Sequence, residues 1–290
     1  MVSAPRLLVI QVAADDPVGR LGDWLTAAGL ELELLRPYDG PTLPSDLSDY
    51  HGLLVLGGGL AATDDAAAPW LPQVRALLRD AVSREVPTLG VCLGAQLLAV
   101  ANGGRVARNP AGPEFGAQLI AKRAVCSGDP LFGPMPITPD VIQWHFDAIT
   151  ALPPGAVQLA SSPVCGVQAF RLGRLAWGIQ FHIETTPELV RAWAITDAQE
   201  LEGYDVQLLL SRSDAAHDDV AEVWQPFAET FADVVRDPGT VRTSRAVPTS
   251  SAEPITDPAA IRAALAAELI ASRGGATALP MPGMRQPGHD

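Results

Sequence analysis

One cysteine stands at a tight turn in the segment TLGVCLGAQLLA, where Cys92 has Gly90 and Gly94 two residues away on either side. An apolar run precedes the cysteine and a helical pattern follows it. This arrangement has the geometry of a nucleophile elbow, in which glycines let strand and helix pass closely while the side chain points outward. The positive end of the helix favours a thiolate, which attacks carbonyl carbons. The alternative is a small buried apolar residue, since free cysteines are often buried.

A thiol nucleophile needs a base, and the base needs a group that orients it. The segment WGIQFHIE offers both, because a strand predicted over residues 177–181 delivers His182 at its end and Glu184 follows two residues later. Residues two apart in an extended chain point to the same side, so the carboxylate can accept the imidazole proton that catalysis does not use. A histidine near a glutamate is usually only a structural pair, but combined with the elbow it favours a catalytic relay.

A developing oxyanion needs two hydrogen-bond donors. Gly57, Gly58 and Gly59 end a predicted strand that neighbours the elbow strand, and the N–H of Leu93 is the first after the cysteine. Three glycines alone are more often a simple exit from a strand. They do not match a nucleotide site, because the GxGxxG spacing is missing and no GK[ST] follows.

The elements around these motifs alternate between apolar runs and helical patterns through the first hundred residues. This alternation predicts a parallel sheet covered by helices. Strands are expected at residues 6–12, 31–35, 52–59 and 87–91, and helices at 17–28, 70–83 and 95–102.

The later part of the chain shows short extended runs between residues 105 and 182, which predict an extension of the sheet and antiparallel pairs. Helical patterns return at 187–201 and 220–235. We therefore expect one domain over residues 1–240. Residues 241–290 are rich in Pro, Ser and Ala and predict a mobile tail with one short helix at 257–273.

Composition excludes several classes of function. The 290 residues are 48% hydrophobic with a formal charge of −13, which disfavours nucleic acid and anionic membranes as partners. No apolar run is long enough to span a membrane. Three widely spaced cysteines argue against a disulfide framework and fit a reducing cytoplasm, and the five histidines show no zinc-ligand spacing, so neither a metal nor a cofactor is expected.

The motifs resemble those of one known family. GGG at 57–59, GVCLGAQLLA at 90–99 and GIQFHIE at 178–184 are similar to the class I glutamine amidotransferases, the type with a Cys-His-Glu triad. GPEFG at 112–116 and the segment beginning QWHFD at 143 resemble the standalone subgroup similar to the amidotransferase domain of GMP synthase. The resemblance covers roughly residues 5–195. It implies a flavodoxin-like α/β fold, an open and mostly parallel sheet with helices on both faces, here with a helical C-terminal extension.

The resemblance also implies roles for individual residues. Cys92 would attack the side-chain amide of glutamine, His182 would transfer the protons and Glu184 would orient His182. Further contacts with the oxyanion or with bound glutamine are implied for Gly57, Gly58, Gly59, Leu93, Gln96, Gln143, Trp144, His145 and Phe146. Two positions depart from the family pattern, which often has proline where Ile183 stands and glycine where Phe146 stands.

Three functions fit these residues. The first is a freestanding amidotransferase or glutaminase that supplies ammonia to a separate synthetase or other acceptor protein, since nothing after residue 195 resembles a synthetase domain. The second is a γ-glutamyl hydrolase or peptidase with the same triad. The third is a non-catalytic interaction protein, against which the intact Cys92, His182 and Glu184 argue. The sequence does not indicate the acceptor or the oligomeric state.

Overall fold

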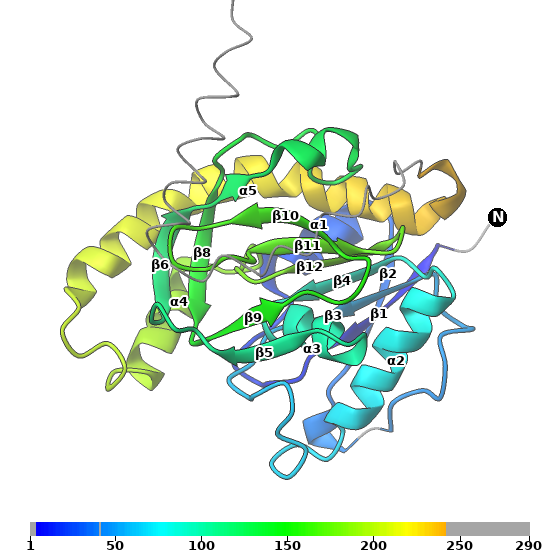
Figure 1. Cartoon of the computed structure of the whole chain (residues 1–290), viewed down its shortest axis with the longest axis horizontal. Coiled ribbons are helices and arrows are strands. Elements are labelled where there is room, and N and C mark those ends of the chain that lie inside the picture. Colours follow the sequence, from blue (N-terminus) through cyan, green and yellow to red (C-terminus); the bar gives the residue numbers. More distant parts are fainter. Residues whose placement is uncertain (1–3, 41, 242–290) are drawn as a thin grey trace, which may run out of the picture.

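The core of the protein is an eight-stranded sheet with the strand order β2-β1-β3-β4-β12-β11-β10-β7 (Figure 1). The computed structural model describes residues 4–40 and 42–241, and the expected tail helix at 257–273 lies outside them. In sheet order the strands are β2 (Glu31–Leu35), β1 (Arg6–Ile10), β3 (Gly52–Val55), β4 (Thr88–Val91), β12 (Ala176–Ile179), β11 (Ala169–Leu172), β10 (Val157–Ser161) and β7 (Ala121–Lys122).

The first five strands of this sheet are parallel and the last three are antiparallel. The order of the parallel part is that of a flavodoxin-like sheet, second strand outermost and first strand beside the third. The predicted fold class is therefore confirmed. In such sheets ligands bind at the carboxyl ends of the strands, which is where β4 delivers Cys92.

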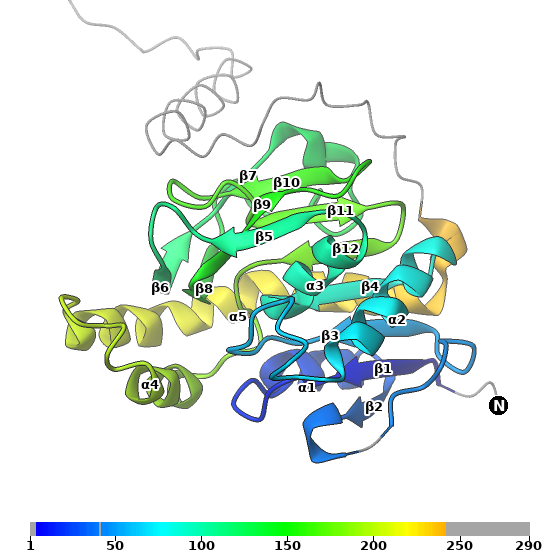
Figure 2. The ribbon, with the colours of Figure 1, turned by 60° about the horizontal axis from the view of Figure 1, so that its bottom comes forward.

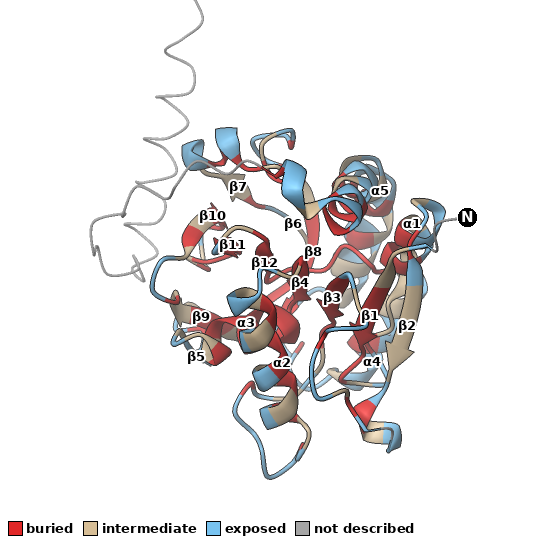
Figure 3. Cartoon of the chain, turned by 90° about the vertical axis from the view of Figure 1, so that its right-hand side faces the viewer, coloured by how far each residue is buried: buried red, intermediate tan, exposed pale blue. Residues whose placement is uncertain are grey.

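Apolar residues fill both faces of the central strands, as expected for strands covered on both sides. In β1, Leu7 and Val9 belong to one buried cluster, which contains residues of α1 (Gly19–Ala27) and α5 (Val206–Arg236). Leu8 and Ile10 belong to the other cluster, with α2 (Leu71–Ser83) and α3 (Leu93–Ala101). Figures 2 and 3 show these helices on the two faces and the buried strands between them.

Two antiparallel pairs and a helix form a smaller layer beside the sheet. β5 (Arg105–Arg108) pairs with β9 (Asp147–Ala151), and β6 (Glu114–Leu119) pairs with β8 (Asp140–His145), which confirms the predicted antiparallel additions. A third apolar cluster packs α4 (Pro187–Thr196) against β6 and β8. Short 3₁₀ helices occur at η1 (Pro37–Asp39), η2 (Ala124–Gly128) and η3 (Pro238–Thr240).

Several element boundaries differ from the prediction. Strands β1 and β3 end at Ile10 and Val55 rather than at residues 12 and 59, and α4 ends at Thr196 rather than at residue 201. Helix α3 begins at Leu93 rather than at residue 95, because the chain turns into the helix directly at Cys92. Strand β12 ends at Ile179 rather than at residue 181. Helix α5 begins at Val206 rather than at residue 220; its first half buries small or polar residues such as Ser213 and Ala216, so the apolar period there is weak. None of the described helices is long and apolar enough to cross a membrane.

Candidate active site

Cys92 lies between β4 and α3 in a backbone conformation that only glycine adopts easily, with φ 50° and ψ −108°. Its N–H donates to the carbonyl of Ile179 at 2.8 Å, and its carbonyl accepts from Gln96 N–H at 3.0 Å. A Cβ on Gly94 would lie 2.0 Å from the carbonyl oxygen of Val55. The glycine therefore lets α3 rest directly on β3, and the predicted elbow forms.

His182 and Glu184 make a buried pair next to the cysteine. Nδ1 of His182 lies 2.5 Å from Oε1 of Glu184, and Oε2 of Glu184 accepts the N–H of Ile183 at 2.8 Å. Both side chains are at most 2% exposed. Burial alone would lower the pKa of His182, but the charge of Glu184, the charge of Cys92 and hydrogen bonds to both residues raise it well above its usual range. The raised pKa makes the ring a stronger base toward the neighbouring thiol.

The local backbone around His182 differs from the one the sequence predicts. The histidine lies beyond the end of β12, where it forms an isolated antiparallel bridge with Ile142 of β8. Its N–H donates to the Ile142 carbonyl at 2.8 Å. Glu184 is placed because its carboxylate folds back onto Ile183, and not because residues alternate along a strand. The two side chains still meet as expected.

A cavity of about 380 Å³ opens beside this pair, and both Cys92 and His182 line it. Its size falls in the range of small-molecule sites. The expected contact residues that also line it are Gly58, Gly59, Gln96, Trp144, His145 and Phe146. The ring of Trp193 lies 4.7 Å from that of His182 and closes one side.

The other expected contacts do not line the cavity. Gly57 lies underneath, where a Cβ would be 3.0 Å from Cε1 of His182 and 2.9 Å from Oδ1 of Asp16. Leu93 has a buried side chain and occupies the first position of α3, where the backbone N–H has no intrahelical acceptor. Gln143 is fully buried, and its side-chain amide makes no hydrogen bond within residues 4–40 and 42–241.

Gln180 is a neighbour of the cysteine that the sequence reasoning missed. Its Nε2 lies 3.7 Å from Sγ of Cys92, and its Oε1 accepts from Nε2 of Gln96 at 3.1 Å. Gln96 also donates to the carbonyl of Asp147 at 3.2 Å. Gln180 precedes His182 by two residues, so the same alternation rule could have identified it.

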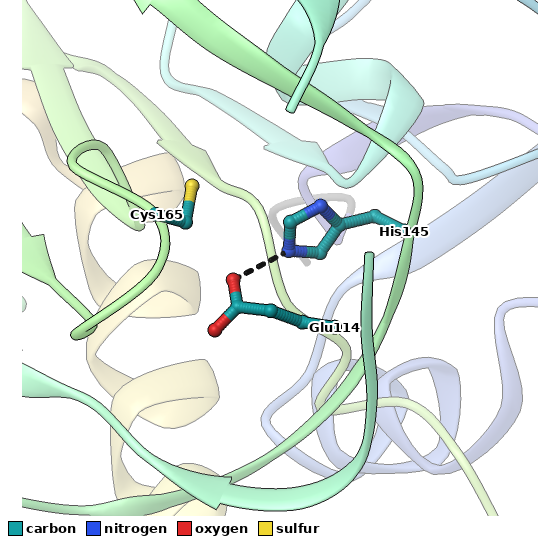
Figure 4. Close-up of side chains that lie close together, drawn as sticks. All are labelled: Glu114, His145 and Cys165. Atoms are coloured by element: carbon teal, nitrogen blue, oxygen red, sulfur yellow. Dashed lines mark hydrogen bonds and ion pairs between the residues drawn. The ribbon is translucent and has the colours of Figure 1, made fainter. Parts of the chain in front are cut away.

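A buried polar network supports the wall formed by residues 144–146, and Figure 4 shows its contact between Glu114 and His145. Oε2 of Glu114 lies 3.0 Å from Nε2 of His145 and accepts from Gln168, while Oε1 accepts from Ser162. Nδ1 of His145 donates to the Asp147 carbonyl at 2.9 Å. The network fixes the end of β8 through side chains of β6 and of the segments around β10.

Two groups of described residues bring three metal-ligating atoms within 4.8 Å of one another. One group is Glu114, His145 and Cys165. In it the carboxylate of Glu114 already has hydrogen-bond partners on both oxygens. The other is Asp16, His182 and Glu184, in which the ring and the glutamate hold each other. Hydrogen bonding explains the first group and most of the second. It leaves Asp16 unexplained.

Other residues that line the cavity escaped prediction, among them Asp16, Arg108, Trp193 and Asp197. Asp16 follows β1, and the rule that ligands bind beyond the carboxyl ends of parallel strands could have indicated it. The other three come from β5 and from α4 and its end, elements that no local motif connects to the cysteine.

Comparison with known proteins decides the family. Residues 22–195 match the model of the family described as glutamine amidotransferase class-I. The chain belongs to this family. It is thus a class I glutamine amidotransferase, an enzyme of the amide hydrolase type, and the resemblance seen in the motifs is confirmed.

Several curated relatives are similar to this amidotransferase over somewhat more than half of its length. A glutamine-hydrolyzing GMP synthase subunit from Halobacterium salinarum is 36% identical over 166 residues, which are 53% of this chain and 81% of that protein. Gamma-glutamyl peptidase 3 from Arabidopsis thaliana is 29% identical over 168 residues, 56% of this chain and 66% of that protein.

Solved structures agree with the fold. A glutamine amidotransferase from Methylobacillus flagellatus is 30% identical and has a TM-score of 0.72, with 86% of this chain and 100% of that chain covered. One from Thermotoga maritima is 27% identical with a TM-score of 0.71, with 79% and 99% covered.

Proposed function

We propose that this amidotransferase hydrolyses the side-chain amide of glutamine through a thioester on Cys92. One observation carries the proposal. The cysteine on its strained elbow, the histidine whose pKa is raised and the cavity that both residues line come together at the carboxyl end of the parallel sheet. A thiol with a base whose orientation is fixed by a third group is the arrangement that acyl transfer requires.

The first half of the reaction forms the thioester. The thiol proton of Cys92 passes to His182, and Sγ attacks the amide carbon. The oxyanion that develops accepts hydrogen bonds from the N–H of Leu93 and from the backbone of Gly58 or Gly59. The carbon–nitrogen bond then breaks, the nitrogen keeps the electron pair and takes the proton from His182, and ammonia leaves.

The second half releases glutamate. A water molecule gives a proton to His182 and attacks the thioester carbon, and the sulfur leaves and recovers that proton. Glu184 keeps Nδ1 of His182 engaged through both halves, so the other ring nitrogen exchanges protons with sulfur, nitrogen and water.

The fate of the ammonia is part of the same proposal. The Halobacterium relative is named as one subunit of a GMP synthase, which supports delivery to a separate synthetase protein. A second candidate function is hydrolysis of γ-glutamyl amines or peptides, favoured by the gamma-glutamyl peptidases among the relatives. The cysteines of the chain are all free, and a cytoplasmic location belongs to this proposal as well.

The test is release of ammonia and glutamate from glutamine by the purified protein and by Cys92→Ala. A matched control is Cys126→Ala, which removes a buried thiol that does not line the cavity. We expect turnover in the wild type and the control and none in Cys92→Ala. Turnover of γ-glutamyl amides but not of glutamine would favour the second function. Turnover that survives Cys92→Ala would overturn both.

A further inference from the structure

Asp16 is a buried acid that the reaction described above does not use. It is 7% exposed and lines the cavity, and its carboxylate makes no hydrogen bond to any residue within 4–40 and 42–241. Burial raises its pKa to about 7; the charge of His182 lowers it, and the charges of Glu184 and nearby aspartates raise it. Because a carboxylate buried without a partner is costly, its place beside a cavity indicates a ligand.

The carboxylate lies close to the reacting groups. A Cβ on Gly57 would be 2.9 Å from Oδ1 of Asp16, 3.0 Å from Cε1 of His182 and 3.4 Å from Cβ of Cys92. The three side chains therefore all lie next to the Cα of Gly57. Carboxylate oxygens of Asp16 and Glu184 and a ring nitrogen of His182 lie within 4.8 Å of one another. Asp16 therefore lies beside the imidazole ring of His182, at the wall of the cavity that both residues line.

The rest of the cavity wall has the same sign of charge. Asp15, Asp147 and Asp197 also line it, whereas Arg108 is the one lysine or arginine among the described residues that do. The guanidinium of Arg108 already lies over the ring of Phe146 at 4.6 Å and 3.7 Å from a carboxylate oxygen of Glu200. Such a wall attracts cations and repels a second carboxylate.

We propose that Asp16 accepts a hydrogen bond from the leaving nitrogen and so selects the leaving group, an inference that rests on the proposed function. When the carbon–nitrogen bond breaks, the nitrogen keeps the electron pair and takes the proton that His182 received from Cys92. The N–H groups of this nitrogen then face the carboxylate of Asp16, which also stabilises the ammonium that forms when the product takes a proton from water.

The substrate class follows from this contact. Ammonia fits beside Asp16, and so does an amine with a second positive charge. A leaving group that carries its own carboxylate, as in γ-glutamyl amino acids and peptides, places that charge against the aspartates of the wall. The site is thus selective for glutamine and cationic γ-glutamyl amines over γ-glutamyl peptides.

The experiment compares three substrates by kcat/KM: glutamine, the γ-glutamyl amide of 1,4-diaminobutane, and γ-glutamylglycine. The proteins are the wild type, Asp16→Asn, Asp16→Glu and the control Asp23→Asn, an exposed aspartate on α1. We expect the wild type to prefer the diaminobutane amide over γ-glutamylglycine by at least about tenfold, and Asp16→Asn to lose most of this preference. Asp16→Glu should keep part of it, and the control all of it.

A second measurement separates this inference from the proposed function. The two substituted amides are titrated calorimetrically into Cys92→Ala and into the double variant with Asp16→Asn, which requires no turnover. Weaker binding of the diaminobutane amide to the double variant, with γ-glutamylglycine bound equally or more tightly, supports the role of Asp16. An equal effect on both ligands, or no preference in the wild type, overturns it. Absence of all turnover would overturn only the proposed function, and the titrations would still decide the role of Asp16.

Discussion

The carboxylate of Glu184 is held by two donors at once, the ring of His182 at 2.5 Å and the backbone N–H of Ile183 at 2.8 Å. Each carboxylate oxygen therefore has its own partner, and the rotamer is fixed within three consecutive residues. The ring it orients is held from the other side by the backbone bridge between His182 and Ile142. The base of the reaction is thus positioned by its own chain segment and by β8.

Replacement of Glu184 by glutamine should reduce kcat for glutamine by about 10²- to 10⁴-fold with a small effect on KM. An amide has one acceptor oxygen, so it can serve either the ring or the Ile183 N–H. The charge that raises the pKa of His182 is also lost, so the pKa should fall. Steady-state kinetics between pH 5 and 9 would show both effects. The control is Glu222→Gln on the exposed face of α5, and an unchanged kcat and pH profile in Glu184→Gln would contradict the prediction.

Gly94 sets how closely α3 packs on β3. In Gly94→Ala the new Cβ would lie 2.0 Å from the Val55 carbonyl, so α3 and β3 must separate. We expect a loss of unfolding free energy of about 3 kcal/mol or more, or failure to fold. Urea unfolding would measure the change. Gly59→Ala has open space at its Cβ and should stay within about 0.5 kcal/mol of the wild type. Equal midpoints for the two variants would be evidence against the close contact.

Local motifs predicted the parts of the site that depend on nearby residues. The elbow at Cys92 and the neighbourhood of His182 and Glu184 are set by glycine and by short-range spacing, which a sequence displays directly. The parallel sheet was predicted for the same reason, because apolar runs and helical patterns alternate along the chain.

The missed parts depend on distant contacts. Asp16 meets His182 because β1 and β12 end at the same edge of the sheet, and Trp193 reaches the ring from α4. The boundary of β12 was placed two residues too late, since the chain leaves the sheet to pair with Ile142, about forty residues earlier. Spacing along the chain carries no information about such pairings.

The network behind the substrate wall gives a prediction of its own. One carboxylate oxygen of Glu114 accepts from Ser162 and the other accepts from Gln168, and the single amide oxygen of a glutamine at this position could not serve both. Glu114→Gln should loosen the end of β8 and raise KM for glutamine about tenfold, with a smaller change in kcat and a stability loss of about 1–3 kcal/mol. Kinetics and urea unfolding beside the exposed control Glu202→Gln would test this. A fall in kcat at constant KM would point to another role.

The buried carboxylate of Asp16 makes stability depend on pH. Its pKa is raised from 3.8 to about 7, first by burial, so the folded state holds a proton that the unfolded state has already lost. Stability is therefore lost as pH rises from about 4 to about 7, and the full effect corresponds to at most about 4 kcal/mol. Asparagine does not ionise, so Asp16→Asn lacks this penalty.

The difference in unfolding free energy between Asp16→Asn and the wild type should consequently grow in favour of the variant from pH 4.5 to pH 8 and level off above. Comparing the two proteins at each pH removes the contributions of groups that behave alike in both, and the coupling of Asp16 to the charge of His182 is part of the difference that remains. Asp23→Asn, which changes an exposed aspartate on α1, should give a difference that does not vary with pH. A constant difference for Asp16→Asn as well would mean that the carboxylate is ionised in the folded protein throughout this range. It would then already have a favourable partner and would need no leaving group to provide one.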